Sequence, residues 1–439
     1  MKKIFAVFLL IVLGALESYA QVSKIYYERP GNQGASDIIS CSEGGYLFLS
    51  SGRVTKVDQN GAVIWENQNT SGMKVVETTG GYYIVGSSDS SYYKFGRLTK
   101  INKQGDILWS KKFRKQEIAI LKHIQRLSNS DLILSLSHYW LGSGFPNYTI
   151  LKTDSLGNII WSRGASQNAT SSITLLDNSD IVIIGSELRE NQPPQFPETC
   201  WPFKKKYNSN GSTLSWVAQP HMDWTACTTS ISDGEFYYIA TSNYNYSVFK
   251  MGDSLIHWTK YFGDFRYNSM CTDTNNLYLT GSRGNTNWAD LFVLSITSEG
   301  DSISTYIDSE DYNHHGVKII IDKDSLVIIG HAKKFNNSDF DVCLTKMPIQ
   351  YILTNNKEIV EEHNSALTIY PNPTSTVIYI DNFYPQQQKS VNIYNLSGEL
   401  ELFKLDTENY IDVTDLNQGL YLIEILCGSE KKIAKFIKK

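Results

Sequence analysis

The sequence predicts an all-β chain with a large repeat domain and a small β-sandwich at its C-terminal end. Three observations lead to this fold class. Runs of about five residues are rich in β-branched and aromatic side chains, and Gly, Asn, Asp and Ser separate them as turns. One such run recurs along most of the chain. No long segment has convincing helical periodicity.

Length and composition exclude several classes of protein. With 439 residues, the chain is too long for one small core, so we expect one large domain with a smaller one, or two to three domains. The proportions of 41% hydrophobic and 19% charged residues argue against a collagenous or disordered chain. The net charge is -5 and no long basic stripe occurs, so nucleic acid is not an expected partner.

Residues 1–20 predict a cleaved secretory signal peptide. Lys2 and Lys3 precede an apolar run from residue 4 to residue 16, and Ser18-Tyr19-Ala20 supplies small residues for a signal peptidase. A membrane anchor is the alternative, but the run is shorter than the roughly 20 apolar residues of a spanning helix. No later stretch qualifies as a transmembrane segment, and Gln21 offers no thiol for a lipid.

Residues 24–350 contain seven copies of a strand phrase such as GGYYIVGS. The copies start at intervals of 36 to 55 residues, and their first strand residues are Tyr46, Tyr82, Leu132, Ile181, Phe236, Leu277 and Leu326. A second phrase, such as TKINKQGDILW, follows five of the copies and ends in Trp65, Trp109, Trp161, Trp216 or Trp258. Repetition at one position indicates packing between neighbouring repeats rather than a ligand site.

Each repeat predicts four strands, and seven such repeats predict a seven-bladed β-propeller over residues 21–350. The seventh copy stops after three strands, and we expect residues 24–30 to supply the fourth and close the ring. An open β-solenoid is the alternative. It is less favoured because the first and last units are complementary halves rather than caps.

The repeat ends at a polar stretch, residues 351–365, which predicts a linker. Residues 366–439 then alternate apolar and polar side chains between Asn-Leu-Ser-Gly and Asn-Gln-Gly turns, which predicts a small Ig-like β-sandwich. Its motif residues are Tyr370, Pro371, Asn372, Pro373, Leu396, Gly398, Gly419 and Tyr421, before a lysine-rich end. The prolines fix two φ values around a turn, and Gly419 frees the backbone before the last hairpin.

This tail resembles the type A C-terminal sorting domain of the type IX secretion system of Bacteroidota. The resemblance implies periplasmic entry by the N-terminal signal and passage through an outer-membrane translocon that recognises residues 366–439. It also implies removal of the tail, with release or attachment to surface glycolipid. An ordinary Ig-like adhesion module is the alternative.

The repeats resemble the propellers that accompany such tails. They resemble the quinoprotein repeat only in part, because the adjacent cysteines that mark its cofactor site are absent. We therefore expect no cofactor. None of the common hydrolase, metalloprotease or nucleotide-binding motifs occurs. His314 and His315, with Asp308, Glu310 and Asp311 upstream, form a candidate metal or acid-base cluster, whereas a solvated polar loop is the favoured interpretation.

Variable loops after the second strand of each repeat carry aromatic residues. In a propeller these loops share one face, which suits stacking on sugars or anchoring of a protein partner. Loops folded over their own blades are the alternative. The candidate binding residues are Tyr93, Trp140, Phe145, Trp201 and Trp288.

Two kinds of covalent modification are also predicted. Cys200 and Cys227 should lie in neighbouring blades on one face, and we expect a disulfide between them if their Cα atoms come within about 7 Å. Four Asp-Ser pairs resemble the short O-glycosylation pattern of Bacteroidota, although Asp-Ser is also ordinary turn chemistry. The acceptors would be Ser155, Ser254, Ser302 and Ser325.

The favoured function is a non-enzymatic binding module that is exported to the cell surface or the medium. One alternative is an exported hydrolase or lyase that acts on polysaccharides with groups converging in the propeller funnel. Another is a structural component of the cell envelope. Paired carboxylates at about 5 to 10 Å in the funnel would favour a glycosidase.

Overall fold

The structure is a computed structural model. It describes residues 22–89, 92–140, 147–165, 168–176, 180–188, 200–218, 225–243, 246–252, 255–263, 265–273, 275–284, 289–308, 312–334, 339–354, 368–381, 389–395, 397–406, 410–427 and 430–439. The predicted signal peptide, residues 1–20, lies outside these ranges. Within them, no helix has the length and apolar character needed to cross a membrane.

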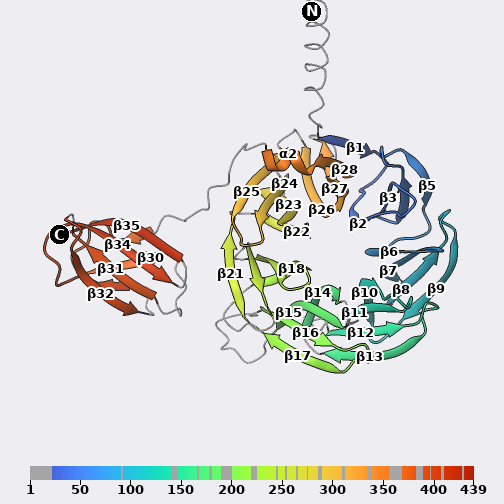
Figure 1. Ribbon diagram of the computed structural model, residues 1–439, viewed down its shortest axis with the longest axis horizontal. Coiled ribbons are helices and arrows are strands. Elements are labelled where there is room, and N and C mark those ends of the chain that lie inside the picture. Colours follow the sequence, from blue (N-terminus) through green and yellow to red (C-terminus); the bar gives the residue numbers. More distant parts are fainter. Residues whose placement is uncertain are drawn as a thin grey trace, which may run out of the picture. The chain divides into compact units, whose positions relative to one another are not determined.

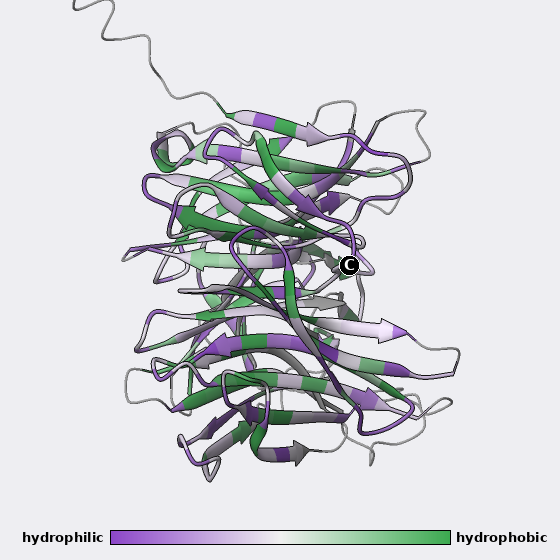
Figure 2. Ribbon diagram, turned by 90° about the vertical axis from the view of Figure 1, so that its right-hand side faces the viewer, coloured by the Kyte–Doolittle hydropathy of each residue, from purple (hydrophilic) through white to green (hydrophobic). Residues whose placement is uncertain are grey.

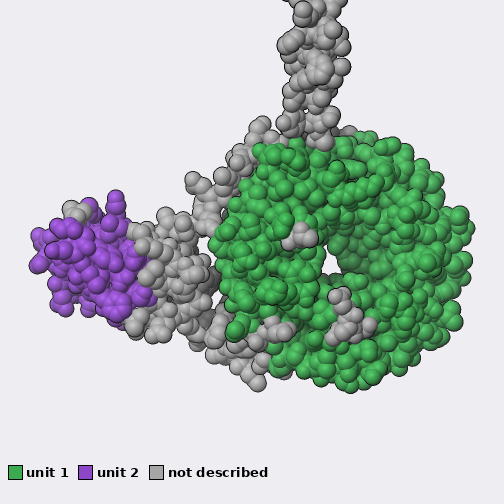
Figure 3. Space-filling view, in the orientation of Figure 1, with its two compact units in different colours: residues 1–360 green, residues 361–439 purple. Residues whose placement is uncertain are grey.

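The chain forms two compact units, residues 1–360 and residues 361–439 (Figure 3). The boundary falls within the predicted linker, residues 351–365. Strands dominate both units, as the sequence predicts.

The described strands of the first unit fall into seven groups of four. The first three groups are β2 (Ala35–Ser40), β3 (Tyr46–Ser50), β4 (Arg53–Val57) and β5 (Val63–Asn67); β6 (Lys74–Thr78), β7 (Gly81–Asp89), β8 (Lys94–Ile101) and β9 (Ile107–Phe113); and β10 (Ile118–Arg126), β11 (Leu132–Tyr139), β12 (Asn147–Thr153) and β13 (Ile159–Ala165). The next three are β14 (Asn168–Leu175), β15 (Ile181–Leu188), β16 (Cys200–Tyr207) and β17 (Thr213–Ala218); β18 (Thr225–Ser232), β19 (Tyr237–Asn243), β20 (Ser247–Met251) and β21 (Ile256–Tyr261); and β22 (Phe265–Thr272), β23 (Asn276–Gly284), β24 (Ala289–Thr297) and β25 (Ser302–Asp308). The last contains β26 (Tyr312–Asp322), β27 (Ser325–Lys334), β28 (Asp341–Pro348) and β1 (Ser23–Tyr27).

Strands that follow one another in a group pair antiparallel. A single parallel pairing, Ile118 with Lys94, joins the second and third groups into one eight-stranded sheet. The first strand of each group lies nearest the centre of the unit (Figure 1). These inner strands contact one another in the order β2, β6, β10, β14, β18, β22 and β26, and β26 contacts β2 again. Figure 3 shows an opening at the centre of this unit.

The N-terminal strand completes the last group. β1 pairs antiparallel with β28, from Ser23 opposite Lys346 to Tyr27 opposite Val342. The Tyr27 hydroxyl also donates to the carbonyl oxygen of Gly61 in the first group, at 2.8 Å. The prediction that residues 24–30 supply the missing strand is confirmed for the part that forms β1.

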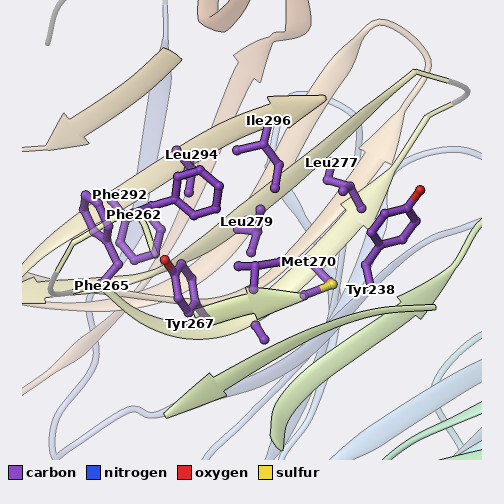
Figure 4. Close-up of a cluster of buried hydrophobic side chains, with 12 residues drawn as sticks. Tyr238, Phe262, Phe265, Tyr267, Met270, Leu277, Leu279, Phe292, Leu294 and Ile296 are labelled. Carbon is purple, nitrogen blue, oxygen red and sulfur yellow. The ribbon is translucent and has the colours of Figure 1, made fainter. Parts of the chain in front are cut away.

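The apolar core lies between neighbouring groups. Every residue of β3 is buried, because both faces of a middle strand are covered, whereas β5 at the outside begins with two exposed residues. Figure 2 shows hydrophobic stretches along many strands and hydrophilic residues in many of the turns. In the apolar cluster between the fifth and sixth groups, Phe265 lies 4.4 Å from Phe292, measured between ring centroids, and both rings belong to the sixth group (Figure 4). Such aromatic pairs add to the stabilisation from burial.

Tryptophans of the outer strands connect neighbouring groups. Their indole Nε1 atoms donate to carbonyl oxygens of the next group, from Trp65 to Lys103 at 2.9 Å, from Trp161 to Ser209 at 3.2 Å and from Trp258 to Ser298 at 3.2 Å. A Cβ atom on Gly105 would come within 2.6 Å of the Trp65 ring. The predicted packing role is therefore confirmed for these three residues. Trp216 is 50% exposed.

A short helix replaces the missing tryptophan of the sixth group. The equivalent residue is Ser304, whose hydroxyl donates to the carbonyl oxygen of Ile352 in α2 (Ile349–Thr354). The Ile352 side chain is 1% exposed and joins the apolar cluster of Tyr278 and Leu326. The predicted linker thus begins as a packed helix. The sequence did not predict this helix, because a six-residue segment is too short to show helical periodicity.

The second unit has two sheets around one core. One sheet pairs β29 (Thr368–Tyr370), β30 (Val377–Asp381) and β33 (Tyr410–Asp412). The other has the order β32 (Leu400–Asp406), β31 (Lys389–Tyr394), β34 (Gly419–Cys427) and β35 (Glu430–Lys438). Ile378 and Ile411 from the first sheet pack with Val391, Ile423 and Phe436 from the second.

Candidate functional site

Two of the five predicted binding residues have described side chains. Tyr93 is 37% exposed before β8, and Trp140 is 55% exposed after β11. Phe145 and Trp288 lie outside the described residues, and only the backbone of Trp201 is described, in β16. These three therefore remain predictions.

Tyr93 belongs to a cluster of aromatic and cationic side chains at one end of the β8–β9 hairpin. The strands are antiparallel, with Gly96 opposite Phe113, so the residues before β8 and after β9 lie together. The Arg114 guanidinium lies 4.1 Å from the Tyr93 ring centroid and 6.0 Å from that of Phe95. We call Tyr93, Phe95, Lys112 and Arg114 the aromatic-cationic surface.

This surface can bind a ligand by two kinds of contact. Lys112 Nζ lies 5.3 Å from the Phe95 centroid, so both rings have a nearby cation. Arg114 presents a planar fork of donors, which suits carboxylate or hydroxyl oxygens. The neighbouring Tyr92 is 81% exposed and adds a further ring. Sequence reasoning missed Lys112 and Arg114, although their position at the end of β9, the strand of Trp109, and directly after it places them beside the variable loops.

A buried hydrogen-bond chain supports the segment that follows Arg114. His138 Nδ1 lies 2.7 Å from Gln116 Oε1, and its Nε2 lies 2.9 Å from Thr149 Oγ1. Lys115 Nζ donates to the same Thr149 oxygen at 2.7 Å. Burial, and secondarily the charge of Lys115, lower the pKa of His138 to about 4. A neutral His138 that donates from Nδ1 and accepts at Nε2 satisfies every partner, and it holds residues 115 and 116 against β11 and β12.

The predicted histidine cluster divides into two environments. His314 is buried, and its Nδ1 lies 2.9 Å from Asp308 Oδ2, which Lys24 also contacts at 2.6 Å. Burial alone would raise the pKa of Asp308, but hydrogen bonds from His314 and Lys24 outweigh it and lower this pKa. This arrangement links β25, β26 and β1.

His315 lies in different surroundings. Its ring centroid is 5.1 Å from that of His331 and 6.0 Å from that of Phe340. Burial, and then the charge of His315, lower the pKa of His331 to about 4. Glu310 and Asp311 lie outside the described residues. In the part of the chain that is described, no three His, Cys, Asp or Glu side chains converge as metal ligands.

The predicted modification sites have mixed outcomes. Cys227 is buried in β18, but the Cys200 side chain is outside the described part, so their disulfide remains a prediction. Ser155 is exposed in a turn. Ser325 is 6% exposed, which leaves little of it accessible to a glycosyltransferase in the folded protein, and Ser302 Oγ is buried. Ser254 lies outside the described residues.

The sorting motif joins the start of the second unit to its end. The Asn372 side chain donates to the carbonyl oxygen of Lys435 at 3.0 Å and accepts from the Ile437 N–H at 2.9 Å. The Thr374 N–H donates to the Ile437 carbonyl at 2.9 Å, and the Lys439 N–H donates to the Thr374 carbonyl at 2.8 Å. The Tyr370–Pro371 and Asn372–Pro373 peptide bonds are both cis. These hydrogen bonds therefore hold the C-terminal strand, β35, against the first residues of the second unit.

The motif residues Gly419 and Tyr421 lie at the start of β34. The Tyr421 hydroxyl donates to the Asn417 carbonyl oxygen at 2.9 Å, and its ring stacks on Phe436 at 5.4 Å. Gly419 has no positive φ, and an added Cβ would meet only the Tyr421 ring, at 3.6 Å. The expectation that Gly419 supplies unusual backbone freedom is therefore not supported.

Comparisons with known proteins identify the second unit. Residues 368–439 match the family described as the secretion system C-terminal sorting domain. No curated protein matches the chain. A protein of unknown function from Bacteroides caccae is 11% identical with a TM-score of 0.37, and the match covers 63% of this chain and 94% of that chain. PorZ, a surface component of the type IX secretion system of Porphyromonas gingivalis, is 10% identical with a TM-score of 0.28, over 92% of this chain and 81% of PorZ. The family match indicates an exported protein that the type IX system delivers to the cell surface or the medium.

Proposed function

We propose that this exported chain is a binding protein in which a seven-bladed β-propeller, residues 21–350, carries the ligand site. Seven four-stranded groups and a closed series of inner strands support the propeller. Residues 1–20 would direct entry into the periplasm. Residues 366–439 would then engage the type IX translocon, and residues 351–365 would connect the two domains.

The aromatic-cationic surface is the observation that carries a binding function. Its rings and cations lie together at the end of the β8–β9 hairpin, and Tyr93 is partly exposed. A glycan suits this surface, because a sugar offers an apolar ring face to an aromatic side chain and oxygen atoms to a guanidinium. We therefore propose an extracellular glycan as the ligand class, with a protein partner as the alternative.

A glycan array probed with the mature chain, followed by calorimetry on any hit, tests this proposal. Replacing Tyr93 by Ala should weaken binding by about fivefold or more, because the anchor of such a site contributes about 1 kcal/mol or more. Arg114→Lys should also weaken it, because an ammonium group cannot present a planar fork of donors. Tyr410→Ala is the matched control, since Tyr410 is similarly exposed at 41% but lies in the second unit.

Three outcomes would count against this function. Equal glycan binding by Tyr93→Ala and Tyr410→Ala would remove the aromatic-cationic surface as the ligand site. Shortened products released from a bound polysaccharide would identify a hydrolase or lyase instead. Retention of the chain in cell-envelope assemblies without any soluble ligand would favour the structural role.

A further inference from the structure

The inner strands of the propeller share a local distortion. Six of the seven have a register shift of the β-bulge type opposite their second strand, as between Ala35 and Asp37 in β2. The seventh inner strand, β6, has no register shift. Its Lys74, which lies opposite Val85, is equivalent to Asp37 of β2, which lies opposite Leu49. We call the residue directly after the bulge, or its equivalent in β6, the inner-ring position.

Side chains at the inner-ring position reach the next inner strand. Asp37 accepts a hydrogen bond from the Val75 N–H at 2.9 Å, and Ser269 accepts one from the Ile319 N–H at 3.3 Å. Asp37 and Ser269 thus play equivalent roles between two pairs of neighbouring groups. The neutral hydroxyl of Ser269 is enough to accept this hydrogen bond from the next inner strand. The hydrogen bond therefore does not explain why charged residues occur at the inner-ring position.

Three consecutive inner strands carry charges there, namely Lys318 in β26, Asp37 in β2 and Lys74 in β6. These strands lie side by side at the centre of the unit (Figure 1). The inner-ring residue of β10 is His123, and those of β14, β18 and β22 are the neutral Ser172, Thr229 and Ser269. The charges are therefore concentrated on one side of the ring.

The two lysines and one aspartate at these positions leave a net positive charge. Asp37 is nearly buried, at 5% side-chain exposure, and Lys74 Nζ lies 3.2 Å from its Oδ1. Together with the Val75 N–H, Lys74 occupies both oxygens of this carboxylate. Lys318 Nζ has no hydrogen-bond or ion-pair partner among the described residues. One positive charge therefore remains without direct compensation.

The pKa of Lys318 depends on burial and on the charges of Lys74 and Asp37. Burial has the largest effect and lowers the pKa of Lys318; the charge of Lys74 lowers it further, whereas Asp37 and Cys271 act in the opposite direction. The side chain of Lys74 is 32% exposed although β6 is an innermost strand, so solvent reaches this cluster. An anion that entered there would find a partly desolvated ammonium group, where electrostatic attraction is stronger than in bulk water.

We propose that Lys318 and Lys74 form a binding site for an oxyanion group at the centre of the propeller. Phosphate, sulfate and carboxylate share the required chemistry, with acceptor oxygens that carry a negative charge. Asp37 holds Lys74 in place, and the second ammonium group leaves the cluster with a net positive charge for the anion. This site is independent of the aromatic-cationic surface, because it lies on the inner strands rather than at the end of the β8–β9 hairpin.

Isothermal titration calorimetry with inorganic phosphate, sulfate and acetate, each at low ionic strength, tests this site on the mature chain. We expect saturable binding of at least one anion, weakened at least tenfold by Lys318→Met and largely retained by Lys318→Arg. Lys346→Met is the matched control, because Lys346 lies in the same group on β28 and is also partly buried. The anion that binds most tightly identifies the group that a natural ligand must carry.

A footprint on the unmodified chain keeps the test independent of folding of the variants. Acylation by an N-hydroxysuccinimide ester, followed by peptide mass spectrometry, should show Lys318 protected by the bound anion and Lys346 unaffected. The proposal is overturned if none of the three anions binds saturably, if Lys318→Met binds like Lys346→Met, or if the anion leaves the acylation of Lys318 unchanged.

Discussion

At the scale of single residues, glycine and tryptophan act as a pair across four of the described interfaces between neighbouring groups. Gly105 has a φ of +90°, in the left-handed region that glycine adopts without a steric penalty. The absence of a side chain also leaves room for the Trp65 ring. The Asn/Asp-x-x-Gly turn of one repeat therefore receives the tryptophan of the repeat before it, which explains why both recur together in the sequence.

Replacing Gly105 by Ala tests this pair. The added Cβ should force the Trp65 ring to move, and overpacking of this kind costs about 1–3 kcal/mol. Gly52→Ala is the control, because Gly52 has a similar φ of +75° but no atom within 4 Å of an added Cβ. Urea unfolding followed by tryptophan fluorescence reports on the first unit alone, since every tryptophan lies between residues 65 and 288. Equal losses of stability in the two variants would show that φ strain, not the Trp65 contact, explains the glycine.

At the scale of elements, the repeat predicted the strands well because each one depends on local residues. Alternating apolar side chains and Asx-Gly turns specify a hairpin wherever they occur, so seven copies specified seven groups. The match of β1 to β28 was also predictable, since a three-stranded last group leaves an unpaired edge. The helix α2 was not, because its place depends on the Ser304 hydroxyl and on apolar side chains that only the folded sixth and seventh groups bring together.

The closing strand β1 should contribute to the stability of the whole ring. Besides its pairing with β28, it precedes Arg29, whose guanidinium forms an ion pair with Glu66 in the first group and whose N–H donates to Asp341 at 3.2 Å. Deleting residues 21–30 should expose the edge of β28 and lower the melting temperature by several degrees. The basis is that a loss of about 1 kcal/mol costs roughly 2–4 °C in domains of about this size.

Thermal unfolding of the purified chain measures this effect. A chain that begins at Ser23 is the control, because it lacks only residues that precede β1. If the deletion and the control melt at the same temperature, β1 does not contribute to closing the ring, and the other contacts between β26 and β2 are sufficient.

At the scale of the whole molecule, the sequence was more informative about export than about ligands. Tyr370, Asn372 and their neighbours lie close in sequence, so the motif is visible before its contacts with Lys435 and Ile437 are known. The inner-ring charges could not be recognised in the same way. Lys318 is more than 240 residues from Lys74, and only the closed series of inner strands brings both beside Asp37.

The division into two units predicts that folding and export can be separated. The strands that close the first unit end at Pro348, and the α2 contacts end at Thr354, so this unit does not depend on residues 366–439 for its core. Deleting residues 366–439 should leave the melting curve of the first unit within about a degree of the full chain, because no buried contact of its core is removed. The truncated chain should nevertheless accumulate inside the cell envelope, since it lacks the matched sorting domain.

Cell fractionation with an antibody against the first unit measures the location, and tryptophan fluorescence measures the folding. Asn372→Ala in the full chain provides an intermediate case. It removes two hydrogen bonds to β35, so it should destabilise the second unit by about 1–3 kcal/mol and reduce export without changing the first unit. Secretion of the truncated chain at the level of the full chain would show that the address lies outside residues 366–439. A truncated chain that is retained but unfolded would instead show that the two units depend on each other, because misfolding alone would then explain the loss of export.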